Sequence, residues 1–238
     1  MQKIDVFITT FLRQDFAKEC VRYLKERTKS EYRLFIIDNG ENEWAKEEEN
    51  VFLYIGMGKN IGIHGAWNIA LSLAESSYMV TSDPDLLIPN LTPDWLSQMV
   101  TFMDQRPDYA AISMHPHIFI GAAGIDPNDP EDVKERNMAG AVFRIMRTDI
   151  VRSVGGWEHK IEEGRNHEER TICSKLQSAG YKVGITSRIR AYHLFGDNWG
   201  YPEWFTPERQ KHTPELKDYV KQFDYQESYD NKTWLPKI

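Results

Sequence analysis

Two aspartates separated by one residue, Asp83 and Asp85, are the side chains in this sequence best placed to do chemistry. They follow residues 78–81, an apolar run that is typical of a buried strand. Because residues i and i+2 of an extended backbone point to the same side, both carboxylates can face one cation. Hard divalent cations prefer oxygen ligands of this kind and commonly bind together with a diphosphate. The alternative, a polar turn with two solvated carboxylates, stays open on these residues alone.

Two further polar stretches follow expected strands. Asp38 ends the apolar residues 33–37 and precedes Asn39-Gly40, so its carboxylate could accept hydrogen bonds from a ribose or a base. The same residue could instead close an Asx turn. Glycines within residues 60–68 permit close backbone approach at the start of a helix, where free N–H groups favour an anion. A plain turn leading into a helix also explains that segment.

The elements that must position these residues alternate between strand and helix patterns. Apolar, β-branched runs predict strands, and apolar residues at helical spacing predict helices. In the first half, the expected strands are residues 3–10, 32–38, 51–55 and 78–81, and the expected helices are residues 14–27 and 62–75. This alternation predicts a parallel, Rossmann-like sheet, in which ligands bind at the carboxyl ends of the strands.

The second half of the chain is less regular. The expected helices are residues 93–105, with Thr92 as N-cap, and residues 147–154 and 168–179; the expected strands are residues 110–114, 141–146, 182–185 and 189–193. Residues 121–137 are polar and rich in turn formers, which predicts a surface loop. No stretch has the composition of an interdomain linker, so one domain is expected.

The composition excludes several classes of protein. The chain has 238 residues, 41% of them hydrophobic, with no apolar stretch of the roughly 20 residues that a membrane helix needs. The amino terminus lacks the features of a secretory signal, and two cysteines are too few for a disulfide scaffold. A cytoplasmic location is therefore expected. The net charge of −7 argues against a nucleic-acid partner.

Taken in order along the chain, these motifs resemble the GT-A glycosyltransferases, and most closely family 2. In the first half, Ile8-Thr9-Thr10 is similar to the family's strand ending in Thr-x-x, and Asp38-Asn39-Gly40 to its Asp-Asn-Gly turn. Residues 60–68 are similar to its Asn-x-Gly helix start, and Asp83-Pro84-Asp85 to its Asp-x-Asp. The second half is similar in a Gly-strand-Arg segment, a Val-Gly-Gly-aromatic segment and a Glu-Asp helix ending in Ala-Gly-Tyr, here residues 139–147, 154–157 and 167–181.

The resemblance covers about residues 4–196 and implies a fold. That fold is a single α/β domain of the GT-A type over residues 1–196, with a Rossmann-like, mostly parallel central sheet flanked by helices. Residues 1–90 would form its nucleotide-binding half and residues 91–196 its acceptor half. Residues 197–238 would follow as an aromatic-rich carboxy-terminal extension.

The resemblance also implies roles for individual residues in binding the donor. The implied nucleotide- and donor-binding residues are Thr9, Thr10, Asp38, Asn60, Gly62, Asn68 and Asp83. The implied ligands of Mn²⁺ or Mg²⁺ are Asp83, Asp85 and His193. Imidazole suits Mn²⁺ better than Mg²⁺, so a histidine ligand would favour manganese. A lone histidine after a short strand could equally be a core or surface residue.

Glu169 stands where the family has its general base, although the family usually has Asp there. Thr171 and Lys175 also replace a second Asp and an Arg. A glutamate can still deprotonate an acceptor hydroxyl. Acids in the first turn of a helix also offset its dipole, and that is the simpler role for Glu168. The residues expected on the acceptor side are Trp157, Glu168 and Trp199, although aromatic rings more often pack on a core.

The implied function is metal-dependent transfer of a sugar from a nucleoside-diphosphate donor to an acceptor hydroxyl, with inversion. UDP-sugars are the commonest donors among similar proteins, and a glycan is the expected acceptor. A retaining transferase on the same fold and an inactive nucleotide- or sugar-binding relative are the alternatives. A nucleotidyltransferase would show a Gly-rich, Lys/Arg-bearing loop after the first strand, where this chain has FLRQD in residues 11–15.

Overall fold

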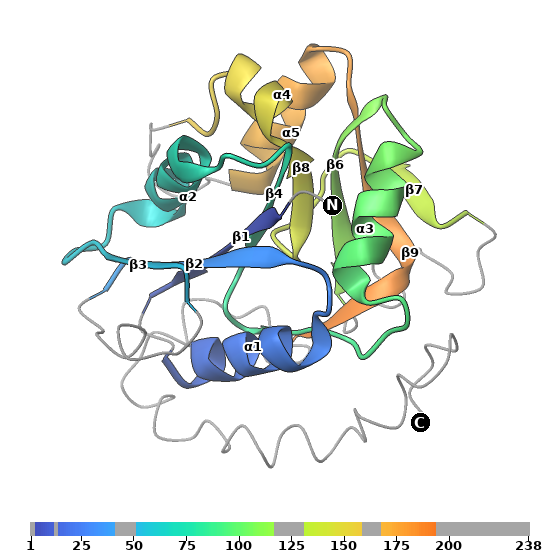
Figure 1. Ribbon diagram of the computed structural model, residues 1–238. Helices are drawn as coiled ribbons and strands as arrows, with labels where there is room; N and C mark the ends of the chain where they lie inside the picture. Colours follow the sequence, from blue (N-terminus) through green and yellow to red (C-terminus); the bar gives the residue numbers. More distant parts are fainter. Residues whose placement is uncertain (1–2, 12–13, 41–50, 117–130, 159–167, 194–238) are drawn as a thin grey trace.

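The computed structural model describes residues 3–11, 14–40, 51–116, 131–158 and 168–193. These residues form a central sheet with helices on both faces (Figure 1). The predicted α/β fold with a sheet between helical layers is therefore confirmed. The expected extension, residues 197–238, lies outside the described residues.

The parallel half of the sheet comes from the first part of the chain. β1 (Ile4–Thr10) lies between β2 (Tyr32–Asp38) and β4 (Tyr78–Ser82), and β3 (Leu53–Gly56) pairs with the outer side of β2. All three pairings are parallel. The carboxyl ends of four strands therefore meet at one edge, which we call the carboxyl edge of the sheet.

The rest of the sheet mixes directions. β8 (Arg144–Arg147) pairs antiparallel with β4 on one side and with β6 (Tyr109–Pro116) on the other. β9 (Lys182–His193) then runs parallel to β6. Two short strands, β5 (Leu86–Leu87) and β7 (Val133–Arg136), pair antiparallel with β9. Residues 182–193 thus form one strand where two were predicted, and residues 133–136 form a strand where a loop was predicted.

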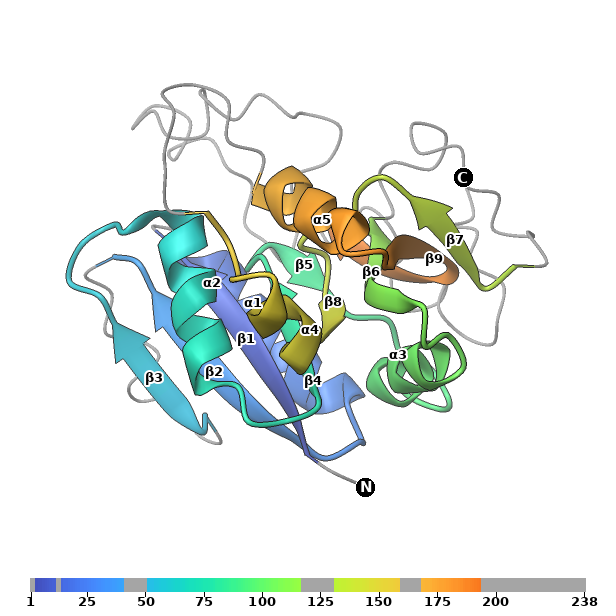
Figure 2. The same ribbon diagram turned by 90° about the horizontal axis from the view of Figure 1, so that it is seen from above.

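Helices cover the two faces of the sheet unequally (Figures 1 and 2). One face carries α1 (Gln14–Arg27) and α3 (Trp95–Asp104). The other carries α2 (Gly62–Leu73), α4 (Thr148–Ser153) and α5 (Glu168–Ser178).

Alternation along the central strand divides the core between these faces. Val6 and Ile8 of β1 are fully buried in the cluster that includes α1 and α3. Phe7, between them in sequence, is fully buried in the cluster that includes α2, α4 and α5. Since β1 is covered on both faces, it reads in the sequence as a continuous apolar run.

The N-cap of α3 differs from the prediction. Asp94, not Thr92, caps the helix, and its Oδ1 accepts hydrogen bonds from the amides of Leu96 and Ser97. Its Oδ2 accepts a further bond from the amide of Ser30 at 2.9 Å. A carboxylate can accept several donors at once, so Asp94 caps the helix and ties it to the connection between α1 and β2.

Candidate active site

The ends of β1 and β2 carry buried polar groups at the carboxyl edge. Thr10 and Asp38 are register partners, and the amide of Asn39 donates to the carbonyl of Thr10 at 2.8 Å. The hydroxyls of Thr9 and Thr10 and Oδ1 of Asn39 are buried with no hydrogen-bond partner among the described residues. Buried polar atoms are nearly always satisfied, so these are acceptors and donors that a polar ligand could use.

Asp38 is fully buried and held from two sides. Its Oδ1 accepts a hydrogen bond from the amide of Gly40 at 2.8 Å, which is the Asx turn that the sequence left as an alternative. Its Oδ2 accepts a bond from the hydroxyl of Tyr54 on β3 at 3.1 Å. Tyr54 does not stand out in the sequence, because its contact with Asp38 depends on the pairing of β2 with β3.

The start of α2 is fixed to the end of β2. Gly62 has φ +76°, a conformation that favours glycine, and its amide donates to Oδ1 of Asn60 at 2.8 Å. Its carbonyl accepts a bond from the side chain of Asn39 at 3.2 Å. The N-cap residue itself, Ile61, makes no side-chain hydrogen bond to this turn. The helix therefore begins at the carboxyl edge with backbone N–H groups available for an anion.

Asn68 takes part in a reciprocal pair of hydrogen bonds with the backbone of Trp157. Its Nδ2 donates to the Trp157 carbonyl, and its Oδ1 accepts from the Trp157 amide, each at 2.9 Å. Gly156 makes this approach possible: its φ is +62°, and a Cβ there would lie 2.5 Å from Oδ1 of Asn68. The structure thus places Asn68 against the 154–157 segment, whereas the resemblance implies that Asn68 contacts the donor.

Trp157 belongs to the core. Its side chain is almost fully buried, and its ring lies 5.5 Å from that of Trp67, measured between centroids. Trp67 is fully buried as well. The ring of Trp157 is buried beneath the surface of the described residues. Its expected place on the acceptor side stays a prediction.

Asp85 and His193 come together at the carboxyl edge. Asp85 lies between β4 and β5 and is almost fully buried, and its Oδ2 is 3.8 Å from Nε2 of His193. The pairing of β5 with β9 causes this approach, because it sets Leu86 opposite His193. Asp83 is only half-buried, and its amide donates to the carbonyl of Ala141 at 3.0 Å.

This pair supplies one carboxylate and one imidazole, a donor set that suits Mn²⁺. In the part of the chain that the structure describes, no group of three His, Cys, Asp or Glu side chains is close enough to hold a metal ion. Cations that bind with a diphosphate take only one or two protein carboxylates and fill their shell with phosphate oxygens and water. Asp85 and His193 therefore fit such a cation as part of its shell.

Cys20 of α1 lies beneath this pair. Burial raises the pKa of the Cys20 thiol, and the nearby negative charge of Asp85 raises it further. The amide of Leu86 has the opposite effect, because it hydrogen-bonds the sulfur. The thiol of Cys20 therefore lies close to the carboxylate of Asp85, which is itself almost fully buried.

Glu169 lies in the first turn of α5, on the opposite face of the sheet from α1. It is half-buried, and Cys173 follows one turn later. Burial raises the pKa of Cys173, Arg144 lowers it, and the charge of Glu169 raises it, which places Glu169 close to that thiol. The side chain of Glu168 and all of Trp199 lie outside the described residues.

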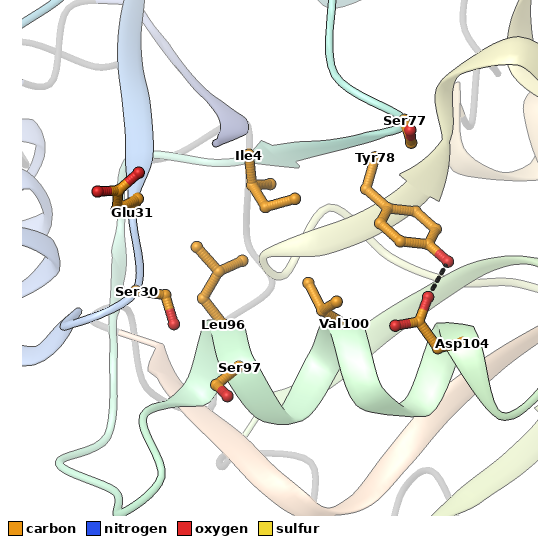
Figure 3. A pocket seen from close by; sticks show the side chains of 9 residues that line it. All are labelled: Ile4, Ser30, Glu31, Ser77, Tyr78, Leu96, Ser97, Val100 and Asp104. Carbon is orange, nitrogen blue, oxygen red and sulfur yellow. Dashed lines mark hydrogen bonds between the residues drawn. The ribbon is translucent and has the colours of Figure 1, made fainter. Parts of the chain in front are cut away.

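A pocket of about 310 Å³ lies at the other edge of the sheet, at the amino ends of β1 and β4 (Figure 3). Its apolar lining includes Ile4, Leu96 and Val100, and on its rim the Tyr78 hydroxyl donates to Asp104 at 2.6 Å. None of the predicted site residues lines this pocket. It is therefore separate from the candidate active site.

Residues 5–157 match the profile of the family described as glycosyl transferase family 2. The chain belongs to glycosyl transferase family 2. The family predicted from the motifs is therefore confirmed. A search of curated protein sequences finds no significant match.

Several solved glycosyltransferases share the fold of this family 2 chain. The mannosyltransferase PcManGT from Pyrobaculum calidifontis, in complex with GDP-Man and Mn²⁺, has a TM-score of 0.67 and 15% identity over 92% of this chain. S. aureus TarS in complex with UDP-GlcNAc has a TM-score of 0.63 and 16% identity over 82%. GalNAc-T7 with UDP, GalNAc and Mn²⁺ has a TM-score of 0.64 and 11% identity over 98%.

This family 2 chain spans only part of each of those proteins. The matched share is 63% of the chain of the Pyrobaculum enzyme, 60% of the TarS chain of residues 1–349 and 55% of the GalNAc-T7 chain. At such low identity, the likeness shows that the fold is shared. Among the described residues, no helix combines the length and the apolar character needed to cross a membrane.

Proposed function

We propose that this protein transfers a sugar from a nucleoside-diphosphate donor to an acceptor hydroxyl. The observation that carries the proposal is the gathering of chemically suitable groups at one edge of the sheet. Polar atoms without partners at Thr10 and Asn39 lie at the ends of neighbouring strands, and Asp85 approaches His193 at the same edge. Family membership makes a nucleotide-sugar the natural ligand of such an edge.

The donor's nucleoside would lie over the ends of β1 and β2. Thr9, Thr10 and Asp38 would bind its ribose or base, with Asn39 as a further partner. The diphosphate would lie near Asn60 and Gly62, where the N-cap residue of α2 makes no side-chain hydrogen bond and the N–H groups that follow Gly62 can face a ligand. Asn68 would contribute through its hold on the 154–157 segment.

A divalent cation, Mn²⁺ or Mg²⁺, would be held by Asp85 and His193, with Asp83 near the ribose and the cation. When bound, such a cation stabilises the negative charge on the departing nucleoside diphosphate as a Lewis acid. Two structural relatives were solved with Mn²⁺, one with GDP-Man and one with UDP and GalNAc. They support manganese and leave both UDP- and GDP-sugars as donor classes, of which we propose UDP.

Glu169 would act as the general base. Its carboxylate would take the proton from an acceptor hydroxyl that attacks the anomeric carbon from the face opposite the leaving group, which inverts that centre. Glu168, Trp157 and Trp199 are proposed on the acceptor side, with a glycan as acceptor. We place the protein in the cytoplasm, where its two free, buried cysteines would stay reduced.

The test is thermal unfolding with UDP, GDP, CDP, ADP and dTDP, each with and without Mn²⁺. A ligand at a hundred times its dissociation constant adds about 2.7 kcal/mol of stability. We expect one diphosphate, UDP first, to stabilise the protein only when Mn²⁺ is present. Asp85→Asn should remove that effect. Asp104→Asn, at the opposite edge of the sheet, is the matched control and should keep it.

Turnover is tested with the sugar nucleotide of the diphosphate that binds. Release of that diphosphate in the presence of Mn²⁺ is expected from the wild-type protein, and NMR of a transferred sugar should show an inverted anomeric centre. A retained centre would assign the retaining mechanism. Binding without any release of diphosphate would assign a nucleotide-binding relative, and no binding of any diphosphate would refute the proposal.

A further inference from the structure

Arg144 is a fully buried cation in β8. Its guanidinium lies 4.8 Å from the ring centroid of Trp67 and 5.6 Å from that of Trp157. No carboxylate among the described residues forms an ion pair with it, and its Nε has no hydrogen-bond partner there. Two indole faces therefore stabilise this charge where an acid would be expected.

The two hydrogen bonds of Arg144 reach segments on either side of β8. Nη1 donates to the carbonyl of Ala139 at 3.0 Å, and Nη2 donates to the hydroxyl of Thr81 at 3.2 Å. Thr81 precedes the Ser82-Asp83 end of β4, which is the donor side of the candidate site. Arg144 thus joins the end of β4 to the turn formed by residues 139–143.

That turn is itself bonded to Asp83. The amide of Asp83 donates to the carbonyl of Ala141 at 3.0 Å, and the amide of Phe143 donates to the hydroxyl of Ser82 at 3.3 Å. Phe143 has φ +42°, which is rare for a residue with a bulky side chain and shows that its surroundings hold the turn in shape. A shift of this turn would therefore move Asp83.

The same turn is bonded to α5. The amide of Ala139 donates to the sulfur of Cys173 at 3.3 Å, one helical turn after Glu169. Lys175 of α5 reaches the 154–157 segment, since its Nζ donates to the carbonyl of Gly156 at 2.8 Å. Trp157, whose ring faces Arg144, follows Gly156 directly.

We propose that Arg144 is a positioning residue that holds the donor side, at Asp83, and the start of α5, at Glu169, in a fixed relation. Its hydrogen bond to Ala139 fixes the turn of residues 139–143, to which Asp83 and α5 are both bonded. Its contact with the Trp157 ring fixes the 154–157 segment, to which Lys175 donates a hydrogen bond. An apolar residue of similar size would fill this interior without burying a charge. The guanidinium adds two directed hydrogen bonds in a rigid plane. The catalytic part of this inference rests on the proposed function.

The first readout is amide hydrogen exchange, which needs no substrate. Arg144→Met keeps volume and removes the hydrogen bonds, whereas Arg144→Lys keeps the charge. Arg147→Met is the matched control, because Arg147 lies on the same strand, 5.4 Å from the Tyr78 ring, and donates to the carbonyls of Tyr109 and Met103. We expect Arg144→Met to speed exchange at least tenfold at the amides of Asp83, Ala139 and Phe143. Arg147→Met should instead speed it around residues 103–109.

The second readout is release of nucleoside diphosphate from the donor with Mn²⁺, at equal margins below each variant's Tm. Arg144→Met should lower kcat at least tenfold and change KM less than threefold, Arg144→Lys should restore part of kcat, and Arg147→Met should keep the wild-type kcat. The proposal would be overturned if the amides of Asp83, Ala139 and Phe143 exchanged at equal rates in Arg144→Met and Arg147→Met. It would also be overturned if Arg144→Met sped exchange at these amides and left kcat unchanged. A wild-type protein that neither binds nor releases a diphosphate refutes the proposed function, and the positioning role with it.

Discussion

Oδ2 of Asp85 lies 3.8 Å from Nε2 of His193, although the two residues are 108 positions apart in the sequence. The short strand β5 brings the two residues together, since its pairing with β9 places His193 opposite Leu86, the residue after Asp85. Because they are held so close, and the carboxylate is almost fully buried, we propose the carboxylate and the imidazole as a preorganised pair for a cation. The proposal of a metal-dependent reaction depends most directly on this pair.

Replacing His193 is expected to weaken the response to metal more than the fold. His193→Gln removes the imidazole and keeps a polar side chain of similar length at the end of β9. The Mn²⁺ concentration that gives half of the nucleotide-dependent stabilisation should rise at least about tenfold. Titration of Mn²⁺ at fixed UDP, followed by thermal unfolding, measures it. An unchanged Mn²⁺ requirement would remove His193 from the proposed ligands.

Glu169→Gln is expected to separate binding from transfer. The amide keeps the size of the side chain and cannot accept the proton of an acceptor hydroxyl, so transfer should fall by a factor of about 10² to 10⁴. Nucleotide-dependent stabilisation with Mn²⁺ should stay as in the wild-type protein. The neighbouring Arg170→Gln serves as control on the same helix turn. Transfer at the normal rate by Glu169→Gln would contradict its role as base.

Asp5 is expected to give the protein a stability that depends on pH. Burial raises its pKa, but hydrogen bonds from Arg33 and from the amides of Ser76 and Glu75 outweigh burial, so its pKa lies below the usual value. A carboxyl with a lowered folded-state pKa stabilises the fold above its unfolded pKa of about 3.9, and this contribution is lost as pH falls through the folded value.

Asp5→Asn should therefore lower the free energy of unfolding by about 1.5–3 kcal/mol at neutral pH. The difference from the wild-type protein should shrink as pH falls below about 4. Urea unfolding across this range measures both values. The exposed Asp108 is a control, because Asp108→Asn should change stability little at any pH. A difference that stays constant down to low pH would contradict the assignment.

The two thiols are expected to be unreactive in the folded protein. Cys20 and Cys173 are fully buried, and burial raises the pKa of each. Since the thiolate is the nucleophile, an aromatic disulfide reagent should label neither residue at neutral pH, and both in urea. Counting labelled thiols with and without urea tests this directly. Rapid labelling of the native protein would show that one of these regions opens.

Elements with strong apolar patterns were predicted closely from the sequence. β2 and α1 have the predicted bounds, and β1 differs by one residue, because each carries a continuous buried run or an apolar stripe. The sequence of β7, VKER, predicts a loop, since it has one buried apolar residue and its strand depends on pairing with β9. β5 has only two residues, too few to show a period.

The same limit applies to the site. Asp38 and Asp85 could be singled out because they follow strands and have side chains with obvious chemistry, and His193 because of its place in the resemblance to family 2. Tyr54 and Arg144 could not, since their importance comes from partners on other elements. Tyr54 contacts the carboxylate of Asp38, and Arg144 contacts the indole rings of Trp67 and Trp157. Contacts across a sheet depend on register, which single-sequence patterns do not specify for short or polar strands.

The buried polar residues at the two ends of β1 differ in how well their hydrogen-bonding groups are satisfied, and this has a consequence for protein engineering. Asp5, at the amino edge, accepts hydrogen bonds from Arg33 and from two backbone amides. At the carboxyl edge, the hydroxyls of Thr9 and Thr10 have no partner among the described residues, which lowers the stability of the ligand-free protein. Filling the pocket beside Ile4 should therefore raise the melting temperature without touching the donor edge. The stability gained there would let directed evolution sample substitutions around Thr10 and Asp38 that the parent fold could not tolerate.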